Sequence, residues 1–233
     1  MSEEQTNPDW LKPLPAIYCA DPRSDNQAVL DMFKPGTNAL AEHHALVAEI
    51  RLAASVPDEV VQQFETTKNL YLYAWFVYRF FPVAEHQALA CLELGLRLRF
   101  AAQLPIKPRK DRNWLPSLRQ FLKFAIDTGA VRNEGFRQWR DQVDFRARQR
   151  YMAEIQNEMI ARDLREMELD YTQASPNDQD REWDYLSILQ EVLPEIRNSY
   201  AHGSTSLHQQ VLGTIELVSE ILNQVFEATA PQS

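Results

Sequence analysis

The chain has 233 residues, of which 45% are hydrophobic and 24% charged, and its formal net charge is −9. This length and apolar content allow a sizeable core and exclude a disordered chain, and the negative charge argues against nonspecific nucleic-acid binding. Glycine is scarce, with 6 residues, whereas Ala, Leu, Glu, Gln and Arg are plentiful, a mixture that favours helices.

The first 36 residues contain five prolines and little hydrophobic periodicity, so we predict an extended N-terminal arm over residues 1–36. Its acidic start, MSEEQTNPDW, lacks the apolar stretch of a secretory signal, and no apolar run reaches the length of a membrane span. We therefore expect a cytoplasmic protein without membrane contact. The two cysteines, Cys19 and Cys91, are too few for a disulfide framework and match no zinc-binding spacing.

The next three predicted elements are helices, over residues 38–54, 57–81 and 82–103. The second carries an aromatic row, Tyr71, Trp75 and Tyr78, whose helical spacing is more typical of a core than of a base-stacking platform. The third is apolar on nearly every side, which predicts a central, buried helix. On it, Glu93 and Arg97 are four residues apart, and we expect an ion pair that could also brace a neighbouring turn.

The middle of the chain is strongly basic. Between Arg97 and Arg150 it has 14 Lys and Arg residues and 5 Asp and Glu residues, so the remainder carries a net charge of −18. This asymmetry indicates either a basic face for an anionic partner or solvated cations. A proline-broken loop holds the candidates for contacts with a phosphate backbone, which are Lys107, Arg109, Lys110 and Arg112. After a short helix closed by Gly129, we predict a charged helical insertion at about 130–170.

Two amphipathic helices are predicted near the C-terminus. The first contains Pro194 and carries the apolar positions Leu186, Leu189, Val192, Leu193, Ile196 and Tyr200. The second begins with a capping box in which Ser206 is the N-cap and Gln209 stands three residues further on. Because no strand is predicted, we expect an all-α bundle of about six helices. Residues 37–229 would then form a single helical domain.

The turn between these two helices carries the residues best suited to chemistry. The segment LPEIRNSYAHG places Arg197 and Asn198 at the end of one helix and His202 in the following turn. Arg binds phosphate bidentately, His transfers protons near neutral pH, and Asn can fix a ring tautomer or a phosphate oxygen. Together they suit phosphodiester cleavage by an internal 2′-hydroxyl, which needs no metal. Arg197 as a solvated cation and His202 as a helix-end cation remain the simpler alternative.

This segment, placed before a final amphipathic helix, resembles the signature of the HEPN superfamily, an Arg and a polar residue followed by His after four to six positions. The segment FETTKNLYLYAWFVYRFFPVAEHQALACLELGLRLRF resembles the two-helix hairpin of HEPN-type proteins from bacterial defence and toxin systems. The likeness covers about residues 57–128 and 183–228. It implies a helical bundle with Arg197, Asn198 and His202 as catalytic residues of a composite site in a homodimer.

The resemblance thus implies a metal-independent endoribonuclease that uses no cofactor and leaves 2′,3′-cyclic phosphate ends. Its expected partners are RNA, a second copy of the chain, and an antitoxin or another protein of a defence or toxin–antitoxin system. The alternative is a non-catalytic HEPN-fold module that binds RNA or protein. A helical scaffold with an accidental motif is the third interpretation.

Overall fold

The structure, a computed structural model, describes residues 7–24, 39–104, 107–109, 112–114, 116–201 and 207–227. Within these ranges the predicted all-α class is confirmed, with eight α-helices against the six or so expected. They are α2 (Ala39–Ala48), α3 (Asp58–Tyr73), α4 (Phe80–Phe100), α5 (Leu118–Asp127), α6 (Arg137–Ala161), α7 (Asp178–Arg181), α8 (Tyr185–Ala201) and α9 (Leu212–Glu227). Three short 3-10 helices accompany them, η1 (Leu14–Ala16), η3 (Asn133–Gly135) and η4 (Tyr171–Gln173).

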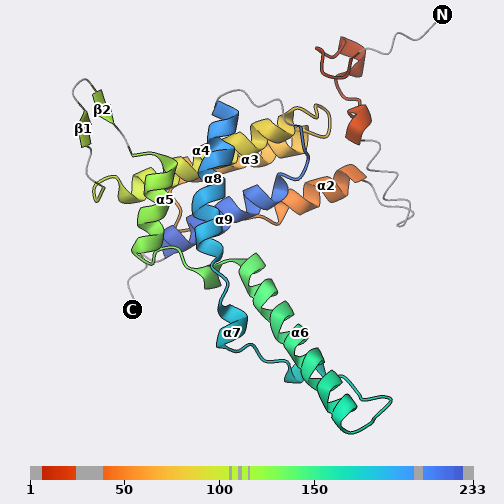
Figure 1. Cartoon of the computed structure of the whole chain (residues 1–233). Coiled ribbons are helices and arrows are strands. Elements are labelled where there is room, and N and C mark those ends of the chain that lie inside the picture. The colour runs from red at the N-terminus through yellow and green to blue at the C-terminus, as the bar shows by residue number, and fades with distance from the viewer. Residues whose placement is uncertain are drawn as a thin grey trace, which may run out of the picture.

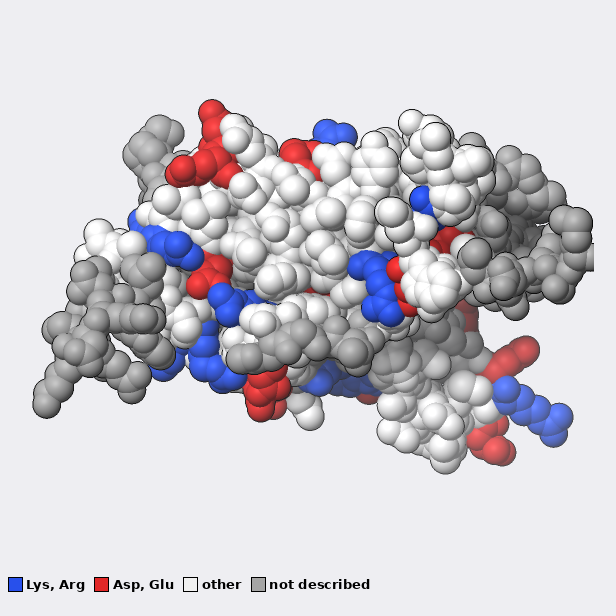
Figure 2. All heavy atoms as spheres, turned by 90° about the horizontal axis from the view of Figure 1, so that it is seen from above, with Lys and Arg blue, Asp and Glu red and all other residues white. Residues whose placement is uncertain are grey.

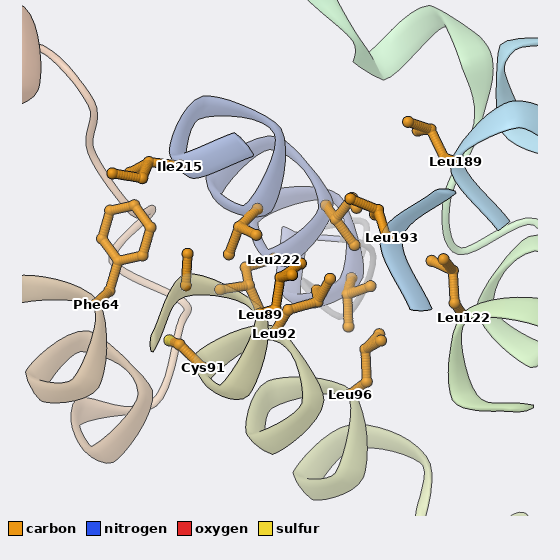
Figure 3. Close-up of a cluster of buried hydrophobic side chains, with 14 of the residues drawn as sticks. Phe64, Leu89, Cys91, Leu92, Leu96, Leu122, Leu189, Leu193, Ile215 and Leu222 are labelled. Carbon is orange, nitrogen blue, oxygen red and sulfur yellow. The ribbon is translucent and has the colours of Figure 1, made fainter. Parts of the chain in front are cut away.

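Helix α4 is the centre of the bundle, as its apolar sequence predicts. Helices α3, α5, α8 and α9 all pack against it (Figure 1). Its side chains Leu89, Leu92 and Leu96 are fully buried among residues from the surrounding helices (Figure 3). Gly95 allows α9 to approach closely, because a Cβ at this position would overlap the side chain of Leu222.

The corner between α3 and α4 differs from the prediction of one helix that runs to residue 81. Helix α3 ends at Tyr73, and α4 begins at Phe80, so that Pro82 lies in the first turn, where a missing N–H costs no hydrogen bond. The N-terminal arm supplies partners for the backbone groups that this break leaves free. The amide of Asp21 donates to the carbonyl of Trp75 (2.9 Å), and its carboxylate accepts from the amide of Tyr78 (3.2 Å).

The charged segment at about 130–170 contains helix α6, which projects away from the bundle together with α7 (Figure 1). Helix α6 ends at Ala161, before the predicted boundary of the insertion near residue 170, and the backbone turns at Asp163, which has a φ of 52°. An ion pair between Arg150 and the buried Asp180 (2.9 Å) fastens α7 to α6.

The region predicted as a cation-bearing loop contains a small antiparallel ribbon. Its strands are β1 (Lys107–Arg109) and β2 (Arg112–Trp114), and Arg109 pairs with Arg112 in the register. Pro108 is tolerated here because a two-stranded ribbon has only edge strands. The ribbon is too short to change the all-α fold class.

Candidate active site at the junction of α4, α8 and α9

The structure places Arg197 and Asn198 in the last turns of α8, as the sequence predicted. The side chain of Arg197 is about one-third exposed, whereas Asn198 is exposed and has no hydrogen-bond partner among the described residues. His202 and the predicted N-cap Ser206 lie outside the described residues. The structure therefore positions two of the three predicted catalytic residues.

Arg197 lies against a carboxylate of the central helix. Its Nε and one terminal nitrogen are 3.2 Å and 3.1 Å from Oε2 of Glu93, whose side chain is largely buried. The other oxygen of Glu93 is 3.7 Å from Arg97, so the ion pair predicted from their spacing is confirmed. Two arginines share one carboxylate, and this arrangement carries a net positive charge that favours an anionic ligand.

One turn further along α8, Tyr200 meets a second carboxylate of α4. The hydroxyl of Tyr200 donates to Oε2 of Glu85 at 2.5 Å, and the hydroxyl of Thr214 donates to Oε1 at 2.6 Å. Glu85 is only 2% exposed. His208 completes the cluster, with its Nε2 at 3.1 Å from the Tyr200 oxygen and 3.4 Å from Oε2 of Glu85. We call these four residues the Glu85 network.

The hydrogen bonds of the Glu85 network assign the tautomer of His208. Tyr200 has one hydroxyl proton and donates it to Glu85, so its oxygen can only accept from the imidazole. The Nε2 of His208 must therefore carry hydrogen, which leaves Nδ1 as the basic nitrogen of the neutral ring. Burial, and then the hydrogen bond to Glu85 and its negative charge, raise the pKa of Tyr200 well above its ordinary value. Tyr200 therefore remains a donor at neutral pH.

A second imidazole lies near this network. The ring of His86, which follows Glu85 on α4, has its centroid 6.2 Å from that of Tyr200. The end of α8 thus places Tyr200 near two histidines, His86 and His208, whereas Arg197 lies one turn earlier against Glu93. Arginine and imidazole side chains are the groups that neutralise phosphate charge and move protons in metal-free phosphodiester chemistry.

The ribbon, which carries the predicted phosphate-contacting residues Lys107, Arg109 and Arg112, lies apart from this junction (Figure 1). For Lys107, Arg109 and Arg112 the structure describes the backbone alone, and Lys110 lies outside the described residues. Figure 2 shows one face of the molecule, seen from above relative to Figure 1. On the described residues of this face, cations stand in small groups beside acidic residues and form no continuous basic area.

Sequence reasoning missed Glu85, His208 and Thr214. His208 was assigned to the predicted final helix, but α9 begins only at Leu212, so His208 lies in the connection where its ring can turn toward α4. The sequence does contain one indication that Glu85 is special: it is a carboxylate between the apolar residues Ala84 and Ala88 of a helix predicted to be buried. Such a carboxylate needs hydrogen-bond donors from elsewhere in the fold.

Comparisons with family models, with curated proteins and with solved structures find no match to this chain. Among the described residues there is no group of three or more His, Cys, Asp or Glu side chains arranged to hold a metal ion. Within the same part of the chain, every helix is too short or too polar to cross a membrane.

Proposed function

We propose that the chain is a HEPN-type endoribonuclease that cleaves single-stranded or looped RNA without a metal. The observation that carries this proposal is the ion pair with Glu93 that holds Arg197 near the end of α8, one turn before Tyr200. A fixed cation suits a reaction in which phosphate charge increases, and an imidazole suits the transfer of the two protons that move.

In the proposed reaction the 2′-oxygen of a ribose attacks the adjacent phosphorus, and the bond from phosphorus to the 5′-oxygen breaks. The products are a 2′,3′-cyclic phosphate and a 5′-hydroxyl. The 2′-hydroxyl proton passes to a base, and the leaving 5′-oxygen receives a proton from an acid. His202 carries proton transfer in this scheme, Arg197 neutralises the charge on the equatorial oxygens, and Asn198 holds a phosphate oxygen or the imidazole ring.

The setting proposed for this activity is bacterial defence or a toxin–antitoxin pair in the cytoplasm. Two copies of the chain would meet near the end of α8, so that their Arg197 and His202 residues form one composite site. An antitoxin or another defence protein would be the regulatory partner. The resemblance of LPEIRNSYAHG to the HEPN signature supports this setting.

A non-catalytic RNA- or protein-binding module is the second candidate. The contact between Arg197 and Glu93 favours it, because an arginine with Nε and one terminal nitrogen on a carboxylate has fewer donors for a phosphate. Cleavage of RNA in the presence of EDTA, compared between the wild type and the Arg197→Ala and His202→Ala variants, separates the two candidates.

A further inference from the structure

A cavity of about 130 Å³ lies between α2, the corner of α3 and α4, and the connection before α9. Aromatic rings form much of its wall, from His43, Tyr71, Trp75 and Phe81. The rings of His43 and Tyr71 are stacked with centroids 4.4 Å apart, and Trp75 and Phe81 lie 5.7 Å and 6.0 Å from His43. These contacts fix the rings in place, and the wall they form suits a planar, aromatic occupant.

The charge of the wall excludes an anion as the occupant. His43 is buried, and its Nε2 donates to the carbonyl of Tyr71 at 2.9 Å. Burial lowers the pKa of His43, so the ring is neutral at pH 7. No Lys or Arg is among the described residues that line the cavity, and the carboxylate of Glu42 is. The cavity therefore favours a ligand that donates hydrogen bonds.

Besides the aromatic rings, two polar side chains line the cavity, Glu42 on α2 and Gln209 before α9. The structure gives neither side chain a hydrogen-bond or ion-pair partner within the described residues. A carboxylate accepts two parallel hydrogen bonds, and an amide both donates and accepts. Of the four RNA bases, guanine alone presents two adjacent N–H donors, N1–H and N2–H, on its Watson–Crick edge, the edge that proteins read in single-stranded RNA.

The cavity adjoins the candidate active site at two points. Gln209 follows His208 directly in the chain, and Phe81 precedes Glu85 by one turn of α4, a rise of about 6 Å. A nucleotide with its base among the rings therefore has its ribose and phosphate within reach of the Glu85 network. The base would pack on aromatic rings, as in other single-strand binding sites.

We infer that this cavity binds one unstacked guanine of the RNA, with the carboxylate of Glu42 on N1–H and N2–H, and that cleavage falls beside this guanosine. The position of cleavage rests on the proposed ribonuclease function, whereas the binding of guanine does not.

The binding test uses the full chain and the four 5′-mononucleotides in isothermal titration calorimetry. All four share the ribose phosphate, so differences between them report on the base. We expect GMP to bind at least about tenfold more tightly than AMP, CMP or UMP, the discrimination typical of one bidentate contact. Glu42→Gln should abolish this preference, because the amide presents an N–H₂ group to the donors of guanine. Glu49→Gln, which replaces an exposed glutamate outside the cavity, is the matched control and should retain it.

Equal affinity for all four nucleotides, absence of GMP binding, or a preference that survives Glu42→Gln would overturn the inference. Binding of tetramethylammonium without binding of GMP would assign the rings to a cationic ligand and would also overturn the inference. Mapping of cleavage sites distinguishes this inference from the proposed function. Selective GMP binding without RNA cleavage would support the guanine site and contradict the ribonuclease function. Cleavage without any guanosine preference or GMP binding would support the ribonuclease function and contradict the guanine site.

Discussion

Tyr200 near the end of α8 donates a 2.5 Å hydrogen bond to Glu85, a buried carboxylate that precedes it by 115 residues on α4. This bond ties the last turn of α8, two residues before His202, to the central helix of the bundle. It is also the contact that orients His208. The position of the candidate site therefore depends on a polar cluster inside an apolar core.

The first prediction concerns the stability that this hydrogen bond supplies. Tyr200→Phe keeps the ring but removes the donor, so the free energy of unfolding should fall by about 1.5–3 kcal/mol, the usual contribution of a hydrogen bond to a charged group. Urea denaturation followed by circular dichroism measures it. Tyr73→Phe is the control, because that ring is 55% exposed, and its effect should stay within about 0.5 kcal/mol. If both variants change the free energy of unfolding equally, the Glu85 network does not contribute to stability.

Helix α4 was predicted correctly because its leucines and small residues form a pattern within one segment. The partners of Glu85 could not be predicted, since Tyr200 and Thr214 are 115 and 129 residues away and no local pattern links them to Glu85. Arg197 was found through a motif, and the resemblance that interpreted it stays a prediction. The ribbon at Lys107–Trp114 was missed because three-residue strands carry too little alternation to be recognised.

A second prediction concerns pH and His43. Burial lowers the pKa of His43 below its ordinary value of 6.5, which the unfolded chain retains. Below about pH 6.5 the unfolded chain therefore binds a proton that the folded chain does not, so the free energy of unfolding should decrease as the pH falls toward 5. The slope from this one group is at most about 1.4 kcal/mol per pH unit.

His43→Gln, which keeps a donor for the carbonyl of Tyr71, should reduce this slope between pH 6.5 and 5. His44→Gln changes an exposed neighbour on the same helix and should alter the slope much less, because the charge of His44 is the smallest of the causes that shift the pKa of His43. Denaturation curves at each pH provide the comparison. Identical slopes in wild type and His43→Gln would show that His43 does not govern the acid sensitivity.

The third prediction tests the cations around the ribbon. Replacement of Lys107, Arg109, Lys110 and Arg112 by Ala should weaken RNA binding for every sequence. It should also make the plot of log affinity against log salt shallower by about 0.7 for each phosphate that the variant no longer neutralises. The control removes two cations at the tip of the insertion, with Arg162→Ala and Arg165→Ala. If the ribbon variant keeps the wild-type salt slope, its cations only interact with solvent.

The fourth prediction concerns assembly. Light scattering at micromolar concentration should report twice the chain mass of 27.1 kDa. Helix α8 exposes two apolar side chains, Ile188 and Val192, on consecutive turns. Val192→Glu would place like charges near a two-fold axis at α8 and should produce monomers. Ile160→Glu, on the exposed tip of α6, should leave the dimer intact. A wild-type monomer at these concentrations would rule out the composite site.

The central claim is that Arg197 and His202 cleave RNA without a metal. The decisive measurement is the rate at which the purified chain cuts a single-stranded RNA in excess EDTA, with the product ends identified. We predict cleavage that leaves 2′,3′-cyclic phosphates, and a loss of at least about 10²-fold in His202→Ala, typical of general acid–base catalysis. Arg197→Ala should lose as much or more, because it removes charge stabilisation at the phosphate. Arg119→Ala, which removes an exposed arginine of α5 that pairs with Glu195, is the control for charge and should retain most of the rate. Wild-type rates in the folded Arg197→Ala and His202→Ala variants, or no cleavage by the folded wild type, would contradict the account.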